Sequence, residues 1–340
     1  MAFTLNQLRT FALVARLGSL RAAAGELGIS EAAVSQTLAG LRAELGDELV
    51  LRGRAGIVLT PGGRVLADRA EQIVGLAQDV PRDVRHASSS DRELRVLATA
   101  AFAEHGAGRL VDLFGKWMPP ASIEVIVEAA SDIPTFLRER VYDIALGAPP
   151  QPGSLRGLSV TPFLKVQRVV VAATSHPLAA VRGSIPFARL LEVPWFAGPG
   201  TFEAETEEGR WFGGLPTLPD AIELTSENDA LAAVASGEGI MLALGHAVAP
   251  RLAIGERPEP EAGRDLARLH VAGTPVTGLW SVTMLEGEDA SGPARLLQRY
   301  VRTAEATAAM ISPAGSRGLS MRGRKLRAAL WTRGLGPPPA

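Results

Sequence analysis

The chain has 340 residues, which is too long for one ordinary hydrophobic core, so we expect two or three domains. Its 35 basic and 36 acidic residues nearly cancel, and the net charge of -1 therefore indicates no class of partner. The lack of cysteine excludes disulfides, thiolate metal sites and a cysteine nucleophile. Neither a secretory leader nor an apolar run of membrane-spanning length is recognisable, so we expect a cytoplasmic protein that does not enter a membrane.

The first 46 residues carry the pattern of three short helices. Apolar residues at helical spacing predict the first helix from Leu5 to Arg16. Ser19 and Ser30 can cap the next two helices, and Gly28 and Gly46 supply left-handed residues that end them. A break of three residues between the second and third helices is typical of a helix-turn-helix.

The third predicted helix has two different faces. Its apolar stripe consists of Val34, Leu38, Leu41 and Leu45. The opposite face carries small or short polar residues, which allow a helix to approach the DNA major groove closely. The alternative is an ordinary solvated face of a helical subdomain. The candidate DNA contacts of this region are Ser19, Arg21, Ser30, Glu31, Ala32, Ser35 and Gln36.

Two short apolar runs, residues 49–51 and 57–59, flank a glycine-containing loop and predict a hairpin. A hairpin after a helix-turn-helix forms a wing, and Arg52 and Arg54 near its tip can reach phosphates or the minor groove. The alternative is a basic surface turn.

A long helix is predicted to begin at Thr60-Pro61, a capping hydroxyl followed by proline at the first helical position. Its apolar positions, which suit packing on a partner helix, are Leu66, Ala70, Ile73, Ala77 and Val80. Pro81 predicts a kink or an end of this helix. The polar residues 86–90 mark the expected domain boundary.

From Glu93 onward, strands and helices alternate in two β-α-β sets, which imply two lobes with parallel sheets. The expected strands are 94–98, 123–127, 144–146, 168–173, 194–197, 221–224, 240–243 and 279–285, and the last helix spans 293–310. Residues 253–264 are expected to form a loop. The basic tail 312–340, rich in glycine and proline near its end, is expected to be disordered.

Hydroxyl residues follow several of the predicted strands. Thr99, Ser131, Thr201 and Ser226 are expected to converge between the two lobes, where ligands bind in such sheets. Hydroxyls and helix-start amides favour an anionic or strongly polar ligand. The alternative for Ser131 and Ser226 is that they only cap helices.

Two rival classes are an enzyme and a solute-binding protein. The five histidines show no ligand spacing, and neither a nucleophile elbow nor a phosphate-binding glycine loop is present. His105 follows the turn that carries Thr99, but a lone histidine is more often structural. We therefore expect no enzyme activity, no cofactor and no metal. The last two thirds alone would suit a solute-binding protein, but the first third argues against it.

The N-terminal region resembles the LysR-type transcriptional regulators. The matching residues are Leu8 to Phe11, Gly18 to Leu20, Ala23, Ala24, Leu27, Ser30, Ser35, Leu41, Leu45, Gly46, Leu49, Arg52 and Leu59 to Gly63. Weaker likeness continues in 142–146, 176–178 and 235–240. The resemblance implies a sequence-specific transcriptional regulator that binds double-stranded promoter DNA and responds to a small-molecule effector. It also implies a homodimer formed through the linker helix and assembled further into a tetramer.

This resemblance implies an α+β protein with four regions. They are a winged helix-turn-helix (1–63), a linker helix with its hinge (64–90), an effector domain (91–311) and the tail (312–340). The effector domain would resemble periplasmic binding proteins, with lobe I at about 91–165 and 266–311 and lobe II at about 166–265.

The sequence departs from the family pattern at several positions. Members commonly carry glutamine and proline where this chain has Glu31 and Ala32, and a basic residue where it has Gln36. Members often show two hydroxyl residues in the first turn of the effector domain, and here Ala101 replaces the second. The missing hydroxyl at Ala101, with Phe102, Trp195 and Phe202 nearby in the sequence, favours a ligand with a sizeable apolar part.

Overall fold

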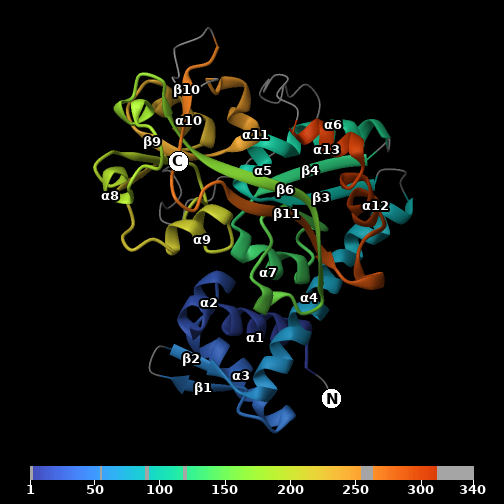
Figure 1. Cartoon of the computed structure of the whole chain (residues 1–340). Helices are drawn as coiled ribbons and strands as arrows, with labels where there is room; N and C mark the ends of the chain where they lie inside the picture. Colours follow the sequence, from blue (N-terminus) through green and yellow to red (C-terminus); the bar gives the residue numbers. More distant parts are fainter. Residues whose placement is uncertain (1–2, 54–55, 89–91, 118–120, 254–262, 312–340) are drawn as a thin grey trace, which may run out of the picture. The chain divides into compact units, whose positions relative to one another are not determined.

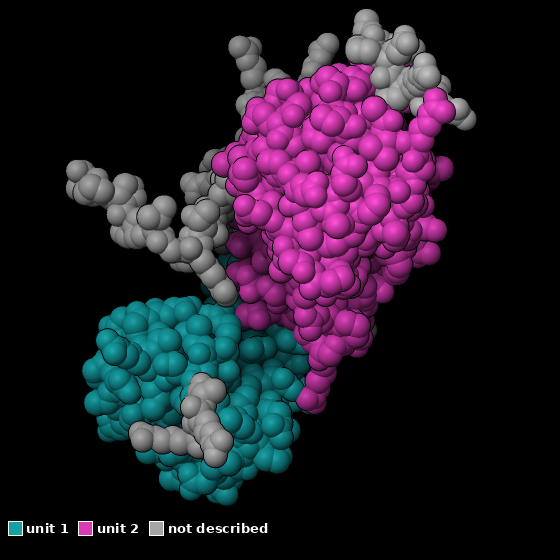
Figure 2. Space-filling view, turned by 60° about the vertical axis from the view of Figure 1, so that its left-hand side comes forward, with its two compact units in different colours: residues 1–90, 138–141 teal, residues 91–137, 142–340 magenta. Residues whose placement is uncertain are grey.

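The computed structural model describes residues 3–53, 56–88, 92–117, 121–253 and 263–311. The chain divides into two compact units (Figure 2). Unit 1 comprises residues 1–90 with 138–141, and unit 2 comprises the remainder. Arg54 and the tail 312–340 lie outside the described residues, as does most of the loop expected at 253–264.

Unit 1 is a three-helix domain with a hairpin and a long helix. Its elements are α1 (Leu5–Leu17), α2 (Leu20–Leu27), α3 (Glu31–Leu45), the antiparallel strands β1 (Val50–Gly53) and β2 (Gly56–Leu59), and α4 (Pro61–Ser88). The hydroxyls of Ser19 and Ser30 accept from the amides of Ala22 and Ala33, so both serines cap helices. Gly28 ends α2 with a φ of +66°, a conformation that favours glycine. The predicted helix-turn-helix and wing are confirmed.

The core of unit 1 fixes which face of each helix remains outside. Phe11, Val14 and Ala23 pack with Val34, Leu38 and Leu41, all of them buried. This core accounts for one face of α3. Leu45, which was expected on the same apolar face, is instead exposed at the end of the helix.

The long helix α4 begins as predicted but does not end at Pro81. The Thr60 hydroxyl accepts from the amide of Gly63 at 2.8 Å and donates to Asp47 at 2.7 Å. The helix runs on to Ser88 with Pro81 inside it, so the expectation of an end there is wrong. Ala70 and Val74 are buried against Leu8 and Ala12 of α1, and part of the predicted partner-facing stripe therefore belongs to the core of the same chain.

Unit 2 is built on one mixed sheet, in the order β4-β3-β5-β11-β6-β9-β7-β8 with β10 beside β6 (Figure 1). The strands are β3 (Arg92–Ala98), β4 (Ala121–Val127), β5 (Ile144–Gly147), β6 (Leu158–Ala173), β7 (Trp195–Ala197), β8 (Ala221–Glu223), β9 (Ile240–Leu244), β10 (Leu266–Leu269) and β11 (Val276–Leu285). The helices are α5 (Ala100–Phe102), α6 (Gly108–Trp117), α7 (Ile133–Arg138), α8 (Phe187–Leu190), α9 (Glu207–Gly213), α10 (Glu227–Ala235), α11 (Gly245–Val248), α12 (Gly292–Val301) and α13 (Ala304–Ile311).

The sheet carries separate hydrophobic cores toward its two ends. One core joins β3, β4 and β5 to α6, α12 and α13; we call this end the first half of unit 2. The second half is built on β7, β8 and β9, and its cores lie against α8, α9 and α10. Strand β6 contributes to both, with Leu164 and Val166 in the first core and Val170 and Ala172 in the second.

The two predicted parallel sets are both present, but they are joined in one continuous sheet. Strands β6 and β11 pair antiparallel along their lengths and join the two parallel sets. The last helix also differs from the prediction. It breaks after Val301, where the Thr303 hydroxyl accepts from the amide of Ala306 and starts α13. Among the described residues, no helix is long and apolar enough to cross a membrane.

Candidate DNA-binding and effector sites

The outer face of α3 is exposed over its whole length. Glu31, Ala32, Ser35 and Gln36 are exposed, as is Ala39 one turn further on. The opposite face, with Val34 and Leu38, is buried in the core of unit 1. A helix held from one side, with small and short polar side chains on the other, has the shape that the major groove accepts.

The other candidate DNA contacts lie on neighbouring elements of unit 1. Ser19 and Ser30 lie at the N-termini of α2 and α3, and Arg21 is exposed in the first turn of α2. Arg52 lies on β1, where its backbone pairs with Ile57 across the hairpin. The DNA contacts of all these residues, and of Arg54, remain predictions.

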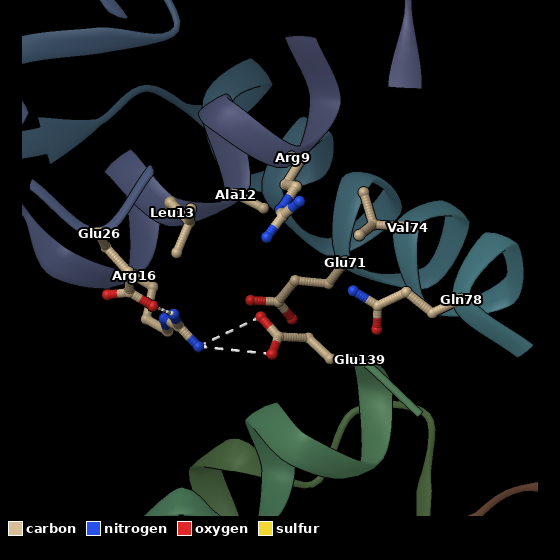
Figure 3. A pocket seen from close by; sticks show the side chains of 9 residues that line it. All are labelled: Arg9, Ala12, Leu13, Arg16, Glu26, Glu71, Val74, Gln78 and Glu139. Atoms are coloured by element: carbon tan, nitrogen blue, oxygen red, sulfur yellow. Dashed lines mark hydrogen bonds and ion pairs between the residues drawn. The ribbon is translucent and has the colours of Figure 1, made fainter. Parts of the chain in front are cut away.

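Unit 1 also contains a charged pocket of about 110 Å³ (Figure 3). Arg16 pairs there with Glu26 at 2.7 Å and with Glu139 at 3.2 Å. Burial raises the pKa of Glu71 on α4 to about 7, against the opposing effect of the Arg138 charge. Among the described residues, no group of three or more acidic or histidine side chains is placed to hold a metal ion.

The structure brings the candidate effector segments of unit 2 together in two pairs. The first pair joins the turn after β3 to the start of α10. The Glu104 carboxylate accepts from the amides of Glu227 and Asn228, each at 2.8 Å. His105 Nε2 lies 3.0 Å from the Glu227 carboxylate. These contacts place the segment that follows Thr99 beside the segment that follows Ser226.

The second pair joins the turn after β4 to the loop after β7. The Glu203 carboxylate accepts from the amide of Ala130 at 3.1 Å. Nearby, the Gln151 amide group donates to the Glu205 carboxylate at 2.9 Å. The segment that holds Ser131 therefore lies beside the loop that holds Thr201 and Phe202.

Individual candidate residues differ in what they offer a ligand. Phe102 is fully buried between Phe163 and Trp280, so it serves the first core and is removed from the candidate ligand contacts. Ala101 is partly buried against the same core. Thr99 is 5% exposed, and its hydroxyl accepts from the amide of Ala148. Gly147 makes room for this contact, since a Cβ there would collide with the Thr99 hydroxyl.

The remaining candidates lie in the two paired segments. The Ser226 hydroxyl caps α10 by accepting from the amide of Asp229, as its alternative interpretation predicted. Ser131 does not cap a helix, because it lies inside a 3-10 turn whose N-cap is Ala129. Thr201 is 7% exposed, and Phe202 is 40% exposed with its ring 5.1 Å from that of Phe212.

A buried charge cluster lies next to the first of these pairs. Arg168 of β6 is 1% exposed, and its Nε lies 2.8 Å from the Glu207 carboxylate. Its Nη2 lies 2.5 Å from Glu208 and 3.0 Å from Glu227. One guanidinium thus joins the starts of α9 and α10 to the central sheet.

The pKa shifts in this cluster follow from burial and from charge. Burial alone would lower the pKa of Arg168, but its three carboxylate neighbours outweigh burial and raise it. Burial raises the pKa of Glu208 well above its ordinary value. Burial would also raise the pKa of Glu227, but Arg168 and His105 lower it to about 2. The pKa values of Glu208 and Glu227, which share one guanidinium, are thus shifted in opposite directions.

The sequence alone does not reveal this cluster. Arg168 and Glu227 are 59 positions apart, and they meet because α10 packs against β6 and β9. The only local signal is the run of acidic residues after Thr206, which resembles the first turn of a capped helix. Thr206 does cap α9.

Comparison with known proteins identifies both regions. Residues 5–64 match the family model of the bacterial regulatory helix-turn-helix protein, lysR family, and residues 87–276 match that of the LysR substrate binding domain. An uncharacterised HTH-type transcriptional regulator of Mycobacterium tuberculosis is 36% identical over 333 residues, covering 96% of this chain and 99% of that protein. The regulator CfxR of Cupriavidus necator is 27% identical over 301 residues, covering 88% of this chain and 91% of CfxR.

Solved structures share the fold. The crystal structure of ArgP from Mycobacterium tuberculosis gives a TM-score of 0.55 at 20% identity, covering 89% of this chain and 96% of that one. A full-length OxyR variant from Pseudomonas aeruginosa gives 0.52 at 18% identity, covering 90% of this chain and 97% of that one. The relatives are transcriptional regulators, so the rival interpretation as an enzyme is excluded. The chain belongs to the LysR-type transcriptional regulators, with a DNA-binding helix-turn-helix and an effector-binding domain.

Proposed function

We propose that this regulator binds a promoter site with inverted-repeat symmetry as a homodimer, with one α3 helix in each of two major-groove segments. The exposed face of α3 carries this proposal, because Ser35 and Gln36 stand on it among small neighbours. A Gln side chain can pair with both hydrogen-bonding groups of an adenine edge. Two symmetry-related helices require half-sites roughly 34–36 Å apart or a multiple of that distance. We place this function in the cytoplasm, where promoter DNA lies.

Gln36→Ala is expected to relax the preferred base at one position of each half-site. A bidentate contact to adenine contributes roughly 1–3 kcal/mol of discrimination, so the preference should fall by about 5- to 150-fold. Selection of binding sites from random DNA by the wild type and the variant measures this change. Ser35→Ala should act in the same way at a neighbouring position.

Gln78→Ala is the matched control for Gln36→Ala, since it makes the same substitution at an exposed glutamine of α4 instead of α3. It should leave the selected motif unchanged. Identical motifs for the wild type and both α3 variants would contradict base reading by this face. Arg52 and Arg54 of the wing are proposed to contact phosphates. Replacing either arginine should therefore lower the affinity for all DNA sequences alike.

We also propose that a small-molecule effector binds between the two halves of unit 2, beside the paired segments. The candidate contacts are Thr99, Ala101, Ser131, Thr201, Phe202 and Ser226. Thr201 is the most informative of them, because its buried side chain lies in the loop that Glu203 ties to the opposite half. An effector bound there would act through its different affinity for two arrangements of the domain.

Thr201→Val is expected to abolish the thermal stabilisation that an effector gives. The change keeps the shape of the side chain and removes the hydroxyl. A panel of small carboxylates and phosphates, screened for a shift in the melting temperature of the full chain, provides the measurement. Thr277→Val, at an exposed position of β11, is the control. A compound that stabilises both variants as well as the wild type would place the site elsewhere.

A further inference from the structure

Each half of unit 2 gives one carboxylate to backbone amides of the other half. Glu104 lies in the π-helical turn after α5 in the first half, and it accepts from the first two amides of α10 in the second half. Glu203 lies in the loop after β7 in the second half, and it accepts from the Ala130 amide in the first half. The two contacts are reciprocal, and they lie in the two paired segments described above.

The two contacts differ in strength. The first amides of a helix have no partner within the helix, and its positive end favours an anion, so Glu104 satisfies two donors at a favourable position. The His105–Glu227 pair reinforces it. Glu203 has one amide donor, and burial raises its pKa together with the charges of Glu205, Asp132 and Glu223. Repulsion among these carboxylates weakens the contact made by Glu203.

We propose that Glu104 and Glu203 form an internal latch that holds the two halves of unit 2 closed without an effector. The inference rests on the proposed effector site, because it concerns the regulation of that site. A carboxylate that accepts from a backbone amide occupies the position that an external anion would take. An anionic effector must therefore displace the carboxylate of the latch or bind beside it.

The latch is tested by hydrogen exchange of the full chain, followed by mass spectrometry without any added ligand. Glu104→Gln keeps the size of the side chain and removes its charge. Amides at the start of α10 should then exchange about tenfold faster. Because the halves open together, amides in residues 128–134 should accelerate by a similar factor, although Glu104 does not touch them. Glu203→Gln should give the same pair of changes.

The control is Glu286→Gln, which alters an exposed carboxylate of the first half and should change neither segment. Amides of residues 170–172 of β6 serve as an internal check, since this part of the strand lies between β9 and β10 in the sheet. If exchange accelerates only at the amides that the mutated carboxylate itself contacts, the latch is overturned. Acceleration that includes β6 would also overturn it, because the carboxylates would then support the fold as a whole. Neither result bears on whether an effector binds beside Thr201, which the thermal-shift screen tests separately.

Discussion

Arg168→Met is expected to lower the free energy of unfolding of unit 2 by about 3–5 kcal/mol. Methionine fills a similar volume, but the change leaves Glu207, Glu208 and Glu227 buried without their cation. Removing one partner of a buried ion pair is costly because the remaining charge keeps its desolvation penalty. Urea unfolding of the full chain, followed by the tryptophan fluorescence of unit 2, measures the loss.

The pH dependence of this loss identifies its cause. In the wild type the pKa of Glu227 is lowered to about 2, so its stabilising contribution is complete above the unfolded pKa and fades as the pH falls toward 2. Without Arg168, buried carboxylates must bind protons to remain folded, and the stability of the variant should decrease as the pH rises. The difference between variant and wild type should therefore be larger at pH 8 than at pH 5.

Arg268→Met on β10 is the control, because this arginine is exposed on the neighbouring strand. It should change the free energy of unfolding by less than about 0.5 kcal/mol. If both variants lose the same free energy of unfolding, or if the loss in Arg168→Met does not depend on pH, the guanidinium does not stabilise the buried carboxylates. Adding Glu207→Gln to Arg168→Met should recover part of the stability, because one buried charge is removed.

Unit 1 could be predicted from the sequence because its signals are local. Ser19 and Ser30 act within three residues of their own positions, and the left-handed Gly28 sits between two helices whose apolar spacing is regular. Caps and helical periodicity depend on residues that are close together in the sequence. The exposed face of α3 followed directly from the buried one.

Unit 2 was predicted less well because its determinants are distant in the sequence. The expected strand began at Arg168, whereas β6 begins at Leu158 and contains Pro162 next to a register shift opposite Trp280 and Ser281. A proline inside a strand argues against a strand unless a bulge accommodates it. Phe102 was assigned to the ligand site from its neighbours in sequence, although its ring packs against Trp280, 178 positions away. Local spacing contains no information about such contacts.

Ile73→Asp is expected to convert the proposed homodimer to a monomer. Part of the predicted stripe on α4 packs inside unit 1, but Ile73, Leu76 and Val80 remain 42%, 49% and 56% exposed on the described helix. Their spacing of three and four residues places them on one face, and a second copy of α4 is the proposed partner of that face. An aspartate in such an apolar seam would be a buried charge without a partner, which strongly opposes association.

The loss of the dimer should be visible on DNA as well as in solution. A dimer binds its second half-site as an intramolecular event, so a monomer should bind the same inverted repeat roughly a hundredfold or more weakly. Light scattering coupled to size exclusion gives the mass, and a gel shift on one and on two half-sites gives the affinities. Leu218→Asp introduces the same charge at a position of unit 2 that is 60% exposed, and it should alter neither result. If Ile73→Asp remains a dimer at low micromolar concentration, a surface other than α4 holds the two copies together.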